Sequence, residues 1–196
     1  MERRRLPSDP ALSRKIFGRT SIAAGNIVQV AGVVAACALL VLAQSGVSRL
    51  SALMSLFAAW VLLYFFCHGI AHWAVGRMVV IHFAFYTIGG TGNPEGYPGG
   101  LRWVFEHLPF FGVQTEKASM QAATPVAKAI MWCAGVTSSA VVPTLAAVYA
   151  WTSRVPGSRP FLFFAIVWAV ATLASNWTSR TGDFSKARRA LPGTRR

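Results

Sequence analysis

The sequence predicts an all-α membrane protein with four transmembrane helices and a short β-like or re-entrant insertion after the second helix. The first observation is composition, because 54% of the 196 residues are hydrophobic and only 13% are charged, whereas soluble domains carry about a quarter of charged residues. The second is that several long stretches hold no Lys, Arg, Asp or Glu. The third is that basic residues gather at both ends of the chain. These features exclude an ordinary soluble domain and intrinsic disorder.

The formal net charge of +13 is concentrated in two tails. Six basic residues fall within the first 19 residues and six within the last 17. Basic segments that flank apolar stretches are typical of membrane proteins, so we expect the lipid bilayer as a partner and no nucleic acid. Cys37, Cys67 and Cys133 lie within apolar runs and are odd in number, which argues against a disulfide framework.

Four charge-free stretches predict membrane spans, because a transmembrane helix needs about 20 mainly apolar residues. The first stretch is too long for the core of a signal peptide, and we interpret it as a retained anchor. We place the spans at about 22–44, 52–75, 124–151 and 160–179, within a membrane domain of residues 21–180.

The two basic tails, residues 1–20 and 181–196, fix the expected orientation. An even number of spans returns both tails to the same side, and the positive-inside rule places that side in the cytoplasm. We therefore expect a multi-pass integral membrane protein of a bacterial or archaeal plasma membrane, with both termini cytoplasmic.

The loop between the second and third spans, residues 78–120, is expected at the membrane interface. Met78–Ile88 is too short to span the membrane and is rich in β-branched and aromatic residues, which favours a strand. Bare strand edges are not tolerated in lipid, so this strand should lie at the interface or against helices. A Gly- and Pro-rich turn follows it, and residues 101–120 predict a short amphipathic segment at the cytoplasmic surface.

Two histidines of the second span are candidate metal ligands. His68 and His72 are four residues apart, which places both rings on one face of a helix. Imidazole pairs of this spacing bind metal ions, and ionisable groups inside a span are costly enough to suggest a function. The alternative is a pair of interfacial histidines that are hydrogen-bonded to their neighbours.

A third ligand could come from Asp183, the only acidic residue after Glu116. It follows the fourth span and should emerge on the same side of the membrane as His72. Two imidazoles and one carboxylate would leave a fourth zinc position open to water, as in catalytic sites. The alternative is a solvated residue that pairs with Arg180 or Arg188.

These residues resemble the motifs of the site-2 protease family of intramembrane zinc metalloproteases. His68-x-x-x-His72 matches the histidines of the family's His-Glu-x-x-His helix. The segment PVAKAIMWCAGVTSSAVV, with Ala134-Gly135 after Pro125, resembles the middle motif and has Val136 where Pro is usual. Asn176 and Asp183 resemble the last motif, in which the aspartate is the third zinc ligand. The resemblance covers residues 52–188 and implies a zinc site, intramembrane proteolysis and a single-span membrane protein as substrate or partner.

The sequence departs from this family at the residue that takes and delivers protons. Gly69 occupies the position of the family's catalytic Glu, and glycine cannot act as an acid or a base. No catalytic residue is therefore assigned. Asn176 lacks the Pro that follows it in the family motif, and Gly182 precedes Asp183 instead of following it, which leaves the register of the third ligand open. The remaining candidates for a relocated base are Glu95, Glu106 and Glu116.

Two further side chains are candidate supporting residues, Asn176 from the family motif and His82 from the strand-like segment. His82 either points toward the His68–His72 face as an extra ligand or is an interfacial residue. His107 lies in an aromatic segment that is typical of membrane-interface anchoring.

The sequence leaves three functions open. The first is a non-proteolytic, metal-binding relative of the site-2 proteases, a pseudoenzyme that binds or regulates a transmembrane partner. The second is an active intramembrane zinc metalloprotease with a relocated general base. The third is a structural subunit of a membrane complex without metal. Retention of the histidine pair alongside Gly69 favours the first, with zinc as the expected ion.

Overall fold

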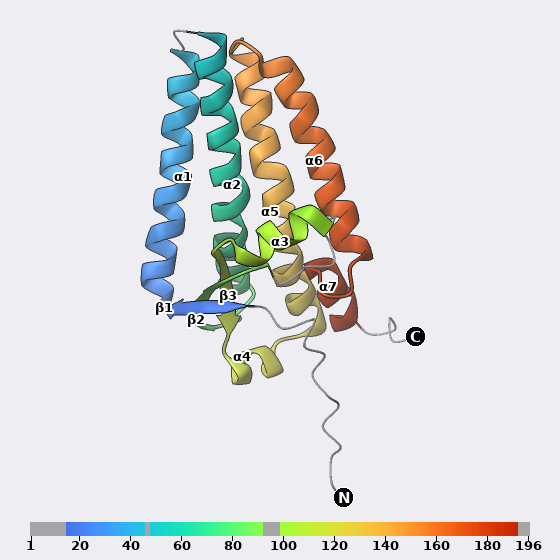
Figure 1. Cartoon of the computed structure of the whole chain (residues 1–196). Helices are drawn as coiled ribbons and strands as arrows, with labels where there is room; N and C mark the ends of the chain where they lie inside the picture. Colours follow the sequence, from blue (N-terminus) through green and yellow to red (C-terminus); the bar gives the residue numbers. More distant parts are fainter. Residues whose placement is uncertain (1–14, 46–47, 92–98, 192–196) are drawn as a thin grey trace, which may run out of the picture.

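The computed structural model describes residues 15–45, 48–91 and 99–191. Four long helices stand side by side in chain order, and a small sheet lies across one end of them (Figure 1). Three shorter helices lie toward the sheet end. The long helices are α1 (Ile22–Gln44), α2 (Arg49–Met78), α5 (Pro125–Thr152) and α6 (Ser158–Thr178). The remaining elements are β1 (Ile16–Thr20), β2 (Phe83–Gly89), α3 (Gly99–His107), β3 (Phe110–Thr115), α4 (Lys117–Ala122) and α7 (Asp183–Ala190).

All four long helices are long and apolar enough to cross a membrane, which confirms the four predicted helical stretches. They contain 23, 30, 28 and 21 residues. At 1.5 Å per residue the shortest is about 31 Å long, which matches the roughly 30 Å of a bilayer core.

The outward face of the bundle is apolar. Ile27, Val34 and Val41 follow one another at intervals of seven residues on α1, and they are 69%, 61% and 64% exposed. Phe163 and Val170 on α6 are exposed at the same spacing. Large exposed apolar surfaces mark contacts with protein or membrane, and the structure is therefore consistent with an integral membrane protein.

Glycines and aromatic side chains pack the bundle. A Cβ atom at Gly32 of α1 would lie 2.3 Å from the ring of Phe66 on α2, so only glycine allows this approach. On the other side of α2, Trp60 stacks on Tyr64 and meets Trp168 of α6 edge to face. These rings fill the space between α2 and α6, while α5 packs against both helices.

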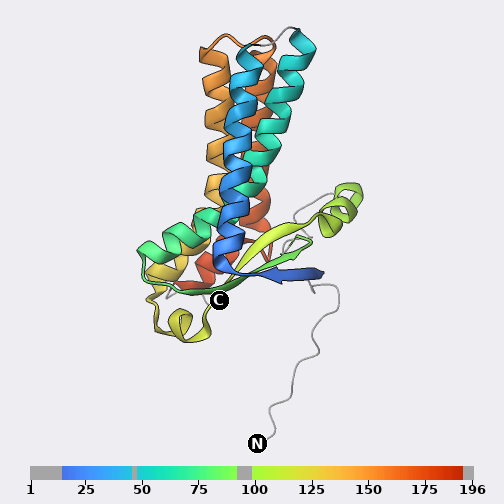
Figure 2. The same ribbon diagram turned by 90° about the vertical axis from the view of Figure 1, so that its left-hand side faces the viewer.

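The sheet is antiparallel with the strand order β1-β2-β3. Tyr86 at its centre pairs with Thr20 on one side and with Val113 on the other. In Figure 2 the sheet extends sideways beyond the helices. Because β2 is the middle strand, β3 is an edge strand, and this edge borders the cavity described below.

The structure refines the prediction for residues 78–120. A strand does form within Met78–Ile88, but it begins at Phe83, because Met78 still belongs to α2. The amphipathic segment expected at 101–120 is divided among α3, β3 and α4. Strand β1 was not predicted. It lies within the predicted basic tail of residues 1–20, and its partner strand is more than 60 residues away.

The predicted C-terminal tail, residues 181–196, is also structured over its first part. Asp183–Ala190 forms α7, which packs against α5 and α6. Asp183, Ser185 and Ala187 are buried, and Arg188 and Arg189 stand in the last turn, where positive charge is favourable to the helix dipole. Both β1 and α7 lie at the sheet end of the bundle (Figure 1).

Candidate metal centre

Two histidines of α2 and one aspartate of α7 meet at the sheet end of the bundle. His68 Nε2 lies 3.3 Å from Asp183 Oδ2, and His72 Nε2 lies 3.2 Å from the same oxygen. One ligand atom from each residue lies within 4.8 Å of the others. His72 and Asp183 are buried, and the His68 side chain is 36% exposed. This cluster could hold a metal ion.

Small residues of α5 allow α2 to bring its histidines this close. A Cβ atom at Gly135 would lie only 2.1 Å from His72 Nε2. One turn further along α5, Ser139 Oγ lies 3.1 Å from His68 Nδ1. Two small residues of α5, Gly135 and Ser139, therefore lie directly against the two imidazoles.

The hydrogen bonds of the two rings fix which nitrogen is free. His72 Nδ1 lies 2.7 Å from the Met131 carbonyl oxygen, which can only accept, so Nδ1 carries the proton. Ser139 Oγ donates its one proton to the Tyr64 carbonyl oxygen at 3.0 Å. Ser139 must then accept from His68 Nδ1–H. In the neutral rings, both Nε2 atoms therefore present lone pairs toward Asp183.

Asp183 is held in place by the turn between α6 and α7. Its backbone N–H donates to Asn176 Oδ1 at 3.1 Å. A Cβ atom at Gly182 would lie 2.7 Å from the Asn176 carbonyl oxygen, so the turn is too tight for a side chain there. Asn176 thus supports the cluster by fixing the backbone at Asp183.

The Asp183 carboxyl group has a different partner on each oxygen. Oδ2 faces the histidines, and Oδ1 accepts a hydrogen bond from Lys186 Nζ at 2.8 Å. Lys186 also lies over the Trp132 ring, 4.6 Å from its centroid. Burial by itself would raise the pKa of Asp183, but the charges of a protonated His72 and of Lys186, together with hydrogen bonds from the protonated rings of His68 and His72, hold this pKa well below its usual range. The carboxyl group is therefore ionised.

Three electron-pair donors that face one another repel unless a cation lies between them. With both Nδ1 atoms protonated toward their own acceptors, the two Nε2 lone pairs and the carboxylate oxygen converge. Protons on the Nε2 atoms or one metal ion would relieve this repulsion. Ligands at about 2.0–2.1 Å in a tetrahedral site lie roughly 3.4 Å apart, close to the 3.2 and 3.3 Å found here.

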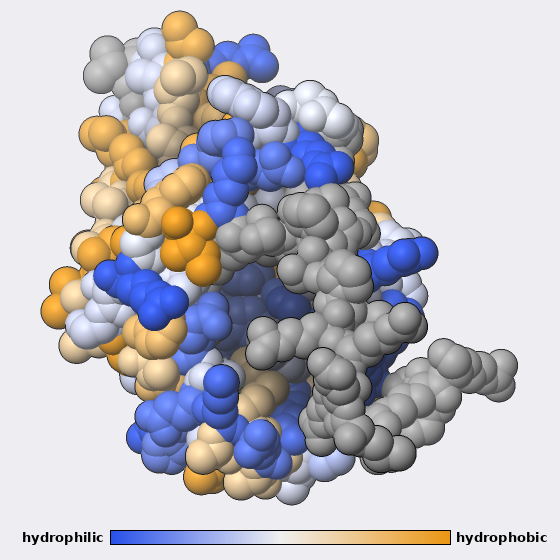
Figure 3. All heavy atoms as spheres, turned by 60° about the horizontal axis from the view of Figure 1, so that its bottom comes forward, coloured by the Kyte–Doolittle hydropathy of each residue, from blue (hydrophilic) through white to orange (hydrophobic). Residues whose placement is uncertain are grey.

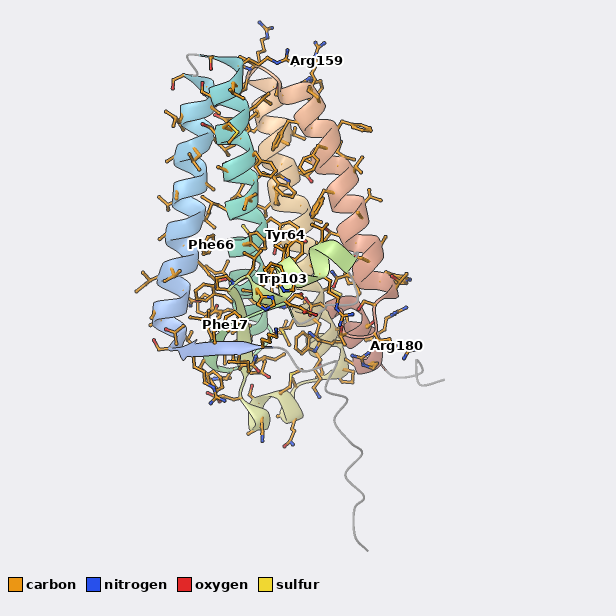
Figure 4. The ribbon with its side chains drawn as sticks, viewed as in Figure 1. Phe17, Tyr64, Phe66, Trp103, Arg159 and Arg180 are labelled. Carbon is orange, nitrogen blue, oxygen red and sulfur yellow. The ribbon has the colours of Figure 1, made fainter. Side chains whose placement is uncertain are left out.

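A cavity of about 350 Å³ opens beside the cluster. One wall is β3, all six residues of which line the cavity, and the floor reaches Tyr64 and Thr172 among the long helices. Figure 4 shows Tyr64 within the bundle. Figure 3, which views the sheet end, shows hydrophilic residues around a hollow on that face. The cluster thus lies where the four long apolar helices meet a polar surface.

The space beside Gly69 is filled from α1. A Cβ atom at Gly69 would lie 2.5 Å from Gln29 Oε1 and 3.2 Å from the Phe111 carbonyl oxygen. Gln29 is fully buried, and its Oε1 has no hydrogen-bond partner among the described residues. Of the acidic residues that the structure describes, only Asp183 lines the cavity. Glu106 instead pairs with Arg102, and Glu95 falls outside the described residues.

The other two histidines lie away from the cluster. His82 is exposed, and its Nδ1 lies 3.0 Å from the Arg77 guanidinium group. It does not join His68 and His72, so the structure does not support its prediction as an extra ligand. His107 lies on α3 next to Lys15 and Trp103.

Sequence reasoning missed three residues that contact the cluster or lie beside Gly69. Lys186 could have been found, because a Lys three residues after an Asp on a helix forms a pair. Ser139 and Gln29 carried no such signal. Each acts on α2 from another helix, and only the packing of α1 and α5 against α2 brings them there.

Ser139 provides a direct test of how the ligands are held. We expect Ser139→Ala to weaken metal binding by about 10- to 100-fold, because the His68 ring loses the acceptor that orients it. The measurement is competition with a chromophoric chelator on detergent-purified protein. Ser138→Ala is the matched control, since Ser138 Oγ donates to backbone carbonyl groups and touches neither ring. Equal affinity of the two variants would contradict a supporting role for Ser139.

Comparison of the chain with protein-family models, with curated proteins and with solved structures finds no match.

Proposed function

We propose that this protein is a non-proteolytic, metal-binding membrane protein with the architecture of a site-2 protease, and that it binds or regulates a transmembrane partner. The observation that carries the proposal is the convergence of His68, His72 and Asp183 around one point, next to Gly69 in place of an acid–base residue. The first part of that observation supports a metal, and the second argues against hydrolysis.

Zinc is the ion that this donor set fits best. Two imidazole nitrogens and one carboxylate oxygen form a known zinc ligand set that leaves a fourth position open. The Met131 carbonyl group and Ser139 orient the rings, as the outer partners of zinc-bound histidines commonly do. Zinc supplies Lewis acidity and lowers the pKa of a bound water. Within the chain, His68, His72 and Asp183 would hold it, and Lys186 would fix the carboxylate.

The surroundings of the cluster favour binding over hydrolysis. Peptide hydrolysis needs a group that accepts a proton from water and returns it to the leaving amine. Gly69 offers no such group, and Gln29 Oε1 beside it is an amide oxygen that does not take up a proton at neutral pH. The cavity therefore supports a site that holds a polypeptide without cleaving it.

The edge of β3 suggests how a partner would be held. Its backbone lines the cavity, and a sheet edge can receive an extended peptide as a further strand. A single-span protein that unwinds near the membrane surface would offer such a segment. Tyr64 and Thr172 on the cavity floor would then lie near the part of the partner inside the membrane. By the positive-inside rule, the basic residues of the two tails support a cytoplasmic side for the sheet end.

Metal content is the first test of this function. We expect the detergent-purified protein to carry stoichiometric zinc by mass spectrometry and the His68→Ala/His72→Ala variant to carry none. His82→Ala is the matched control, because His82 is an exposed histidine outside the cluster, and it should keep its metal. Absence of metal from the wild-type protein would overturn the metal-binding part of the proposal and favour a structural subunit.

Proteolysis is tested on the same preparations. We expect no cleavage of single-span model substrates by the wild-type protein, with or without added zinc. Cleavage that disappears in His68→Ala and after chelation would instead identify an active metalloprotease with its base elsewhere.

A further inference from the structure

A second cavity lies at the end of the bundle opposite the sheet. It has a volume of about 620 Å³ and is bordered by the start of α2, the end of α5 and the connection to α6. Three arginines line it, Arg49, Arg154 and Arg159. Figure 4 shows Arg159 at this end of the bundle, far from the sheet and from the metal cluster.

The three guanidinium groups carry positive charge that no acidic residue in the described part of the chain neutralises. Within residues 15–45, 48–91 and 99–191, none of them forms a side-chain hydrogen bond or an ion pair. The sequence supplies no acidic residue nearby, since it has no Asp or Glu in either 10–94 or 117–182. Three cations around one cavity, without a carboxylate, favour an anionic ligand.

The backbone adds to this positive potential. α6 begins at this cavity after Gly157, and no side chain caps its first turn. The N-terminus of a helix carries partial positive charge that attracts anions. At α6 this contribution comes from the helix dipole, because the Ser158 N–H donates to the Val155 carbonyl oxygen and Pro160 has no N–H. The start of α2, by contrast, is closed by a capping box between Ser48 and Ser51.

The connection that bears Arg154 and leads to Arg159 at the start of α6 has a defined conformation. Val155 is buried, and its N–H donates to the Ala150 carbonyl oxygen at 3.0 Å. Arg154 and Gly157 both have positive φ, at 59° and 81°. A Cβ atom at Gly157 would lie 2.6 Å from Leu53, so the loop is pressed against α2. Arg154 therefore projects from a packed loop, and Arg159 from the first turn of the helix that follows it.

We propose that the phosphate of an anionic phospholipid headgroup binds in this cavity. Guanidinium groups bind phosphate oxygens in a bidentate manner and are the side chains best suited to this task. The cavity lies at the end of four helices long enough to cross the bilayer, at the depth where headgroups lie. Trp151, which also lines it, is of the type that gathers at this depth. The phosphate would join the start of α2 to the start of α6.

The test compares two variants that remove the same charge from opposite ends. In the first variant Arg49, Arg154 and Arg159 are replaced by Gln, and in the second Lys117, Lys128 and Arg180 are replaced by Gln. Native mass spectrometry counts bound phosphatidylglycerol as that lipid is titrated into the detergent-purified protein. We expect roughly tenfold weaker binding in the first variant, because charge-assisted hydrogen bonds are lost. The second variant should bind like the wild type.

A parallel titration with inorganic phosphate distinguishes the source of the ligand. We expect no arginine-dependent binding of free phosphate at millimolar concentration. The lipid assignment would be overturned if binding of free phosphate required the three arginines while binding of phosphatidylglycerol did not. Equal lipid binding by both variants would overturn the site itself. Unchanged zinc content and thermal unfolding of the first variant show that it is folded, and Arg159→Gln alone repeats the test with a smaller change.

Discussion

Gly135→Ala is expected to remove the metal from this protein. The new methyl group would stand 2.1 Å from His72 Nε2 and 2.5 Å from Cδ2 of the same ring. The His72 ring has little freedom to move away, because its Nδ1–H donates a hydrogen bond to the Met131 carbonyl oxygen on α5, the helix that also carries Gly135. Either the ring turns away or α5 moves off α2, and both changes separate the ligand atoms. We expect metal affinity to fall by roughly 100-fold or more.

Metal content and chelator competition measure this effect, as they do for Ser139→Ala. Gly99→Ala is the control, because a Cβ atom at Gly99 would have no neighbour within 4 Å. The Gly135→Ala variant must also unfold at a temperature close to that of the metal-free wild type, so that the loss is assigned to the site. Wild-type zinc content in Gly135→Ala would show that Nε2 of His72 is not a ligand.

Placing a Glu at position 69 is expected to create proteolytic activity, but only when position 29 is changed as well. The Cβ atom that Gly69→Glu introduces would lie 2.5 Å from Gln29 Oε1, so the two side chains would compete for one buried space. Gln29→Ala opens that space. A positioned acid–base group contributes about 10²- to 10⁴-fold to a hydrolytic rate, so we expect the double variant to cleave where the wild type does not.

Cleavage of quenched fluorescent peptides and of a single-span model substrate measures the gain. The Gln29→Ala variant is the control for the added space, and Gly69→Glu alone should be weakly active or unstable. The activity must disappear when His68→Ala is added to the double variant. A zinc-loaded double variant without any cleavage would mean that the cavity does not present a peptide bond to the cluster, and the likeness to the proteases would not extend to substrate geometry.

The sequence predicted the helices and the three converging side chains because each depends on local pattern. Charge-free stretches longer than about 20 residues have few alternatives to a membrane helix. His68 and His72 share a helix face by spacing alone, and Asp183 was the only acidic residue after Glu116, following the fourth stretch on the side expected for His72. The family resemblance itself stays a prediction.

The parts that could not be predicted depend on contacts between distant segments. β1 pairs with residues about 70 positions away, and its own residues looked like part of a basic tail. Gln29 is an ordinary polar residue in an apolar helix until α1 is packed against Gly69. Ser139 differs from Ser138 only in the direction in which α5 turns it. Side-chain direction across helix interfaces is set by tertiary packing, which a single sequence does not display.

The late position of Asp183 has a consequence for how the protein is made. This residue lies 111 positions after His72, and α5 and α6 lie between the two in the sequence. Ribosomes synthesise the chain from its N-terminus, so the two histidines are made long before Asp183. A nascent or truncated chain that ends before α7 would offer only the imidazole pair. Tight binding of a metal ion would therefore require the chain to be made as far as α7, and it would indicate that α7 has packed against the bundle.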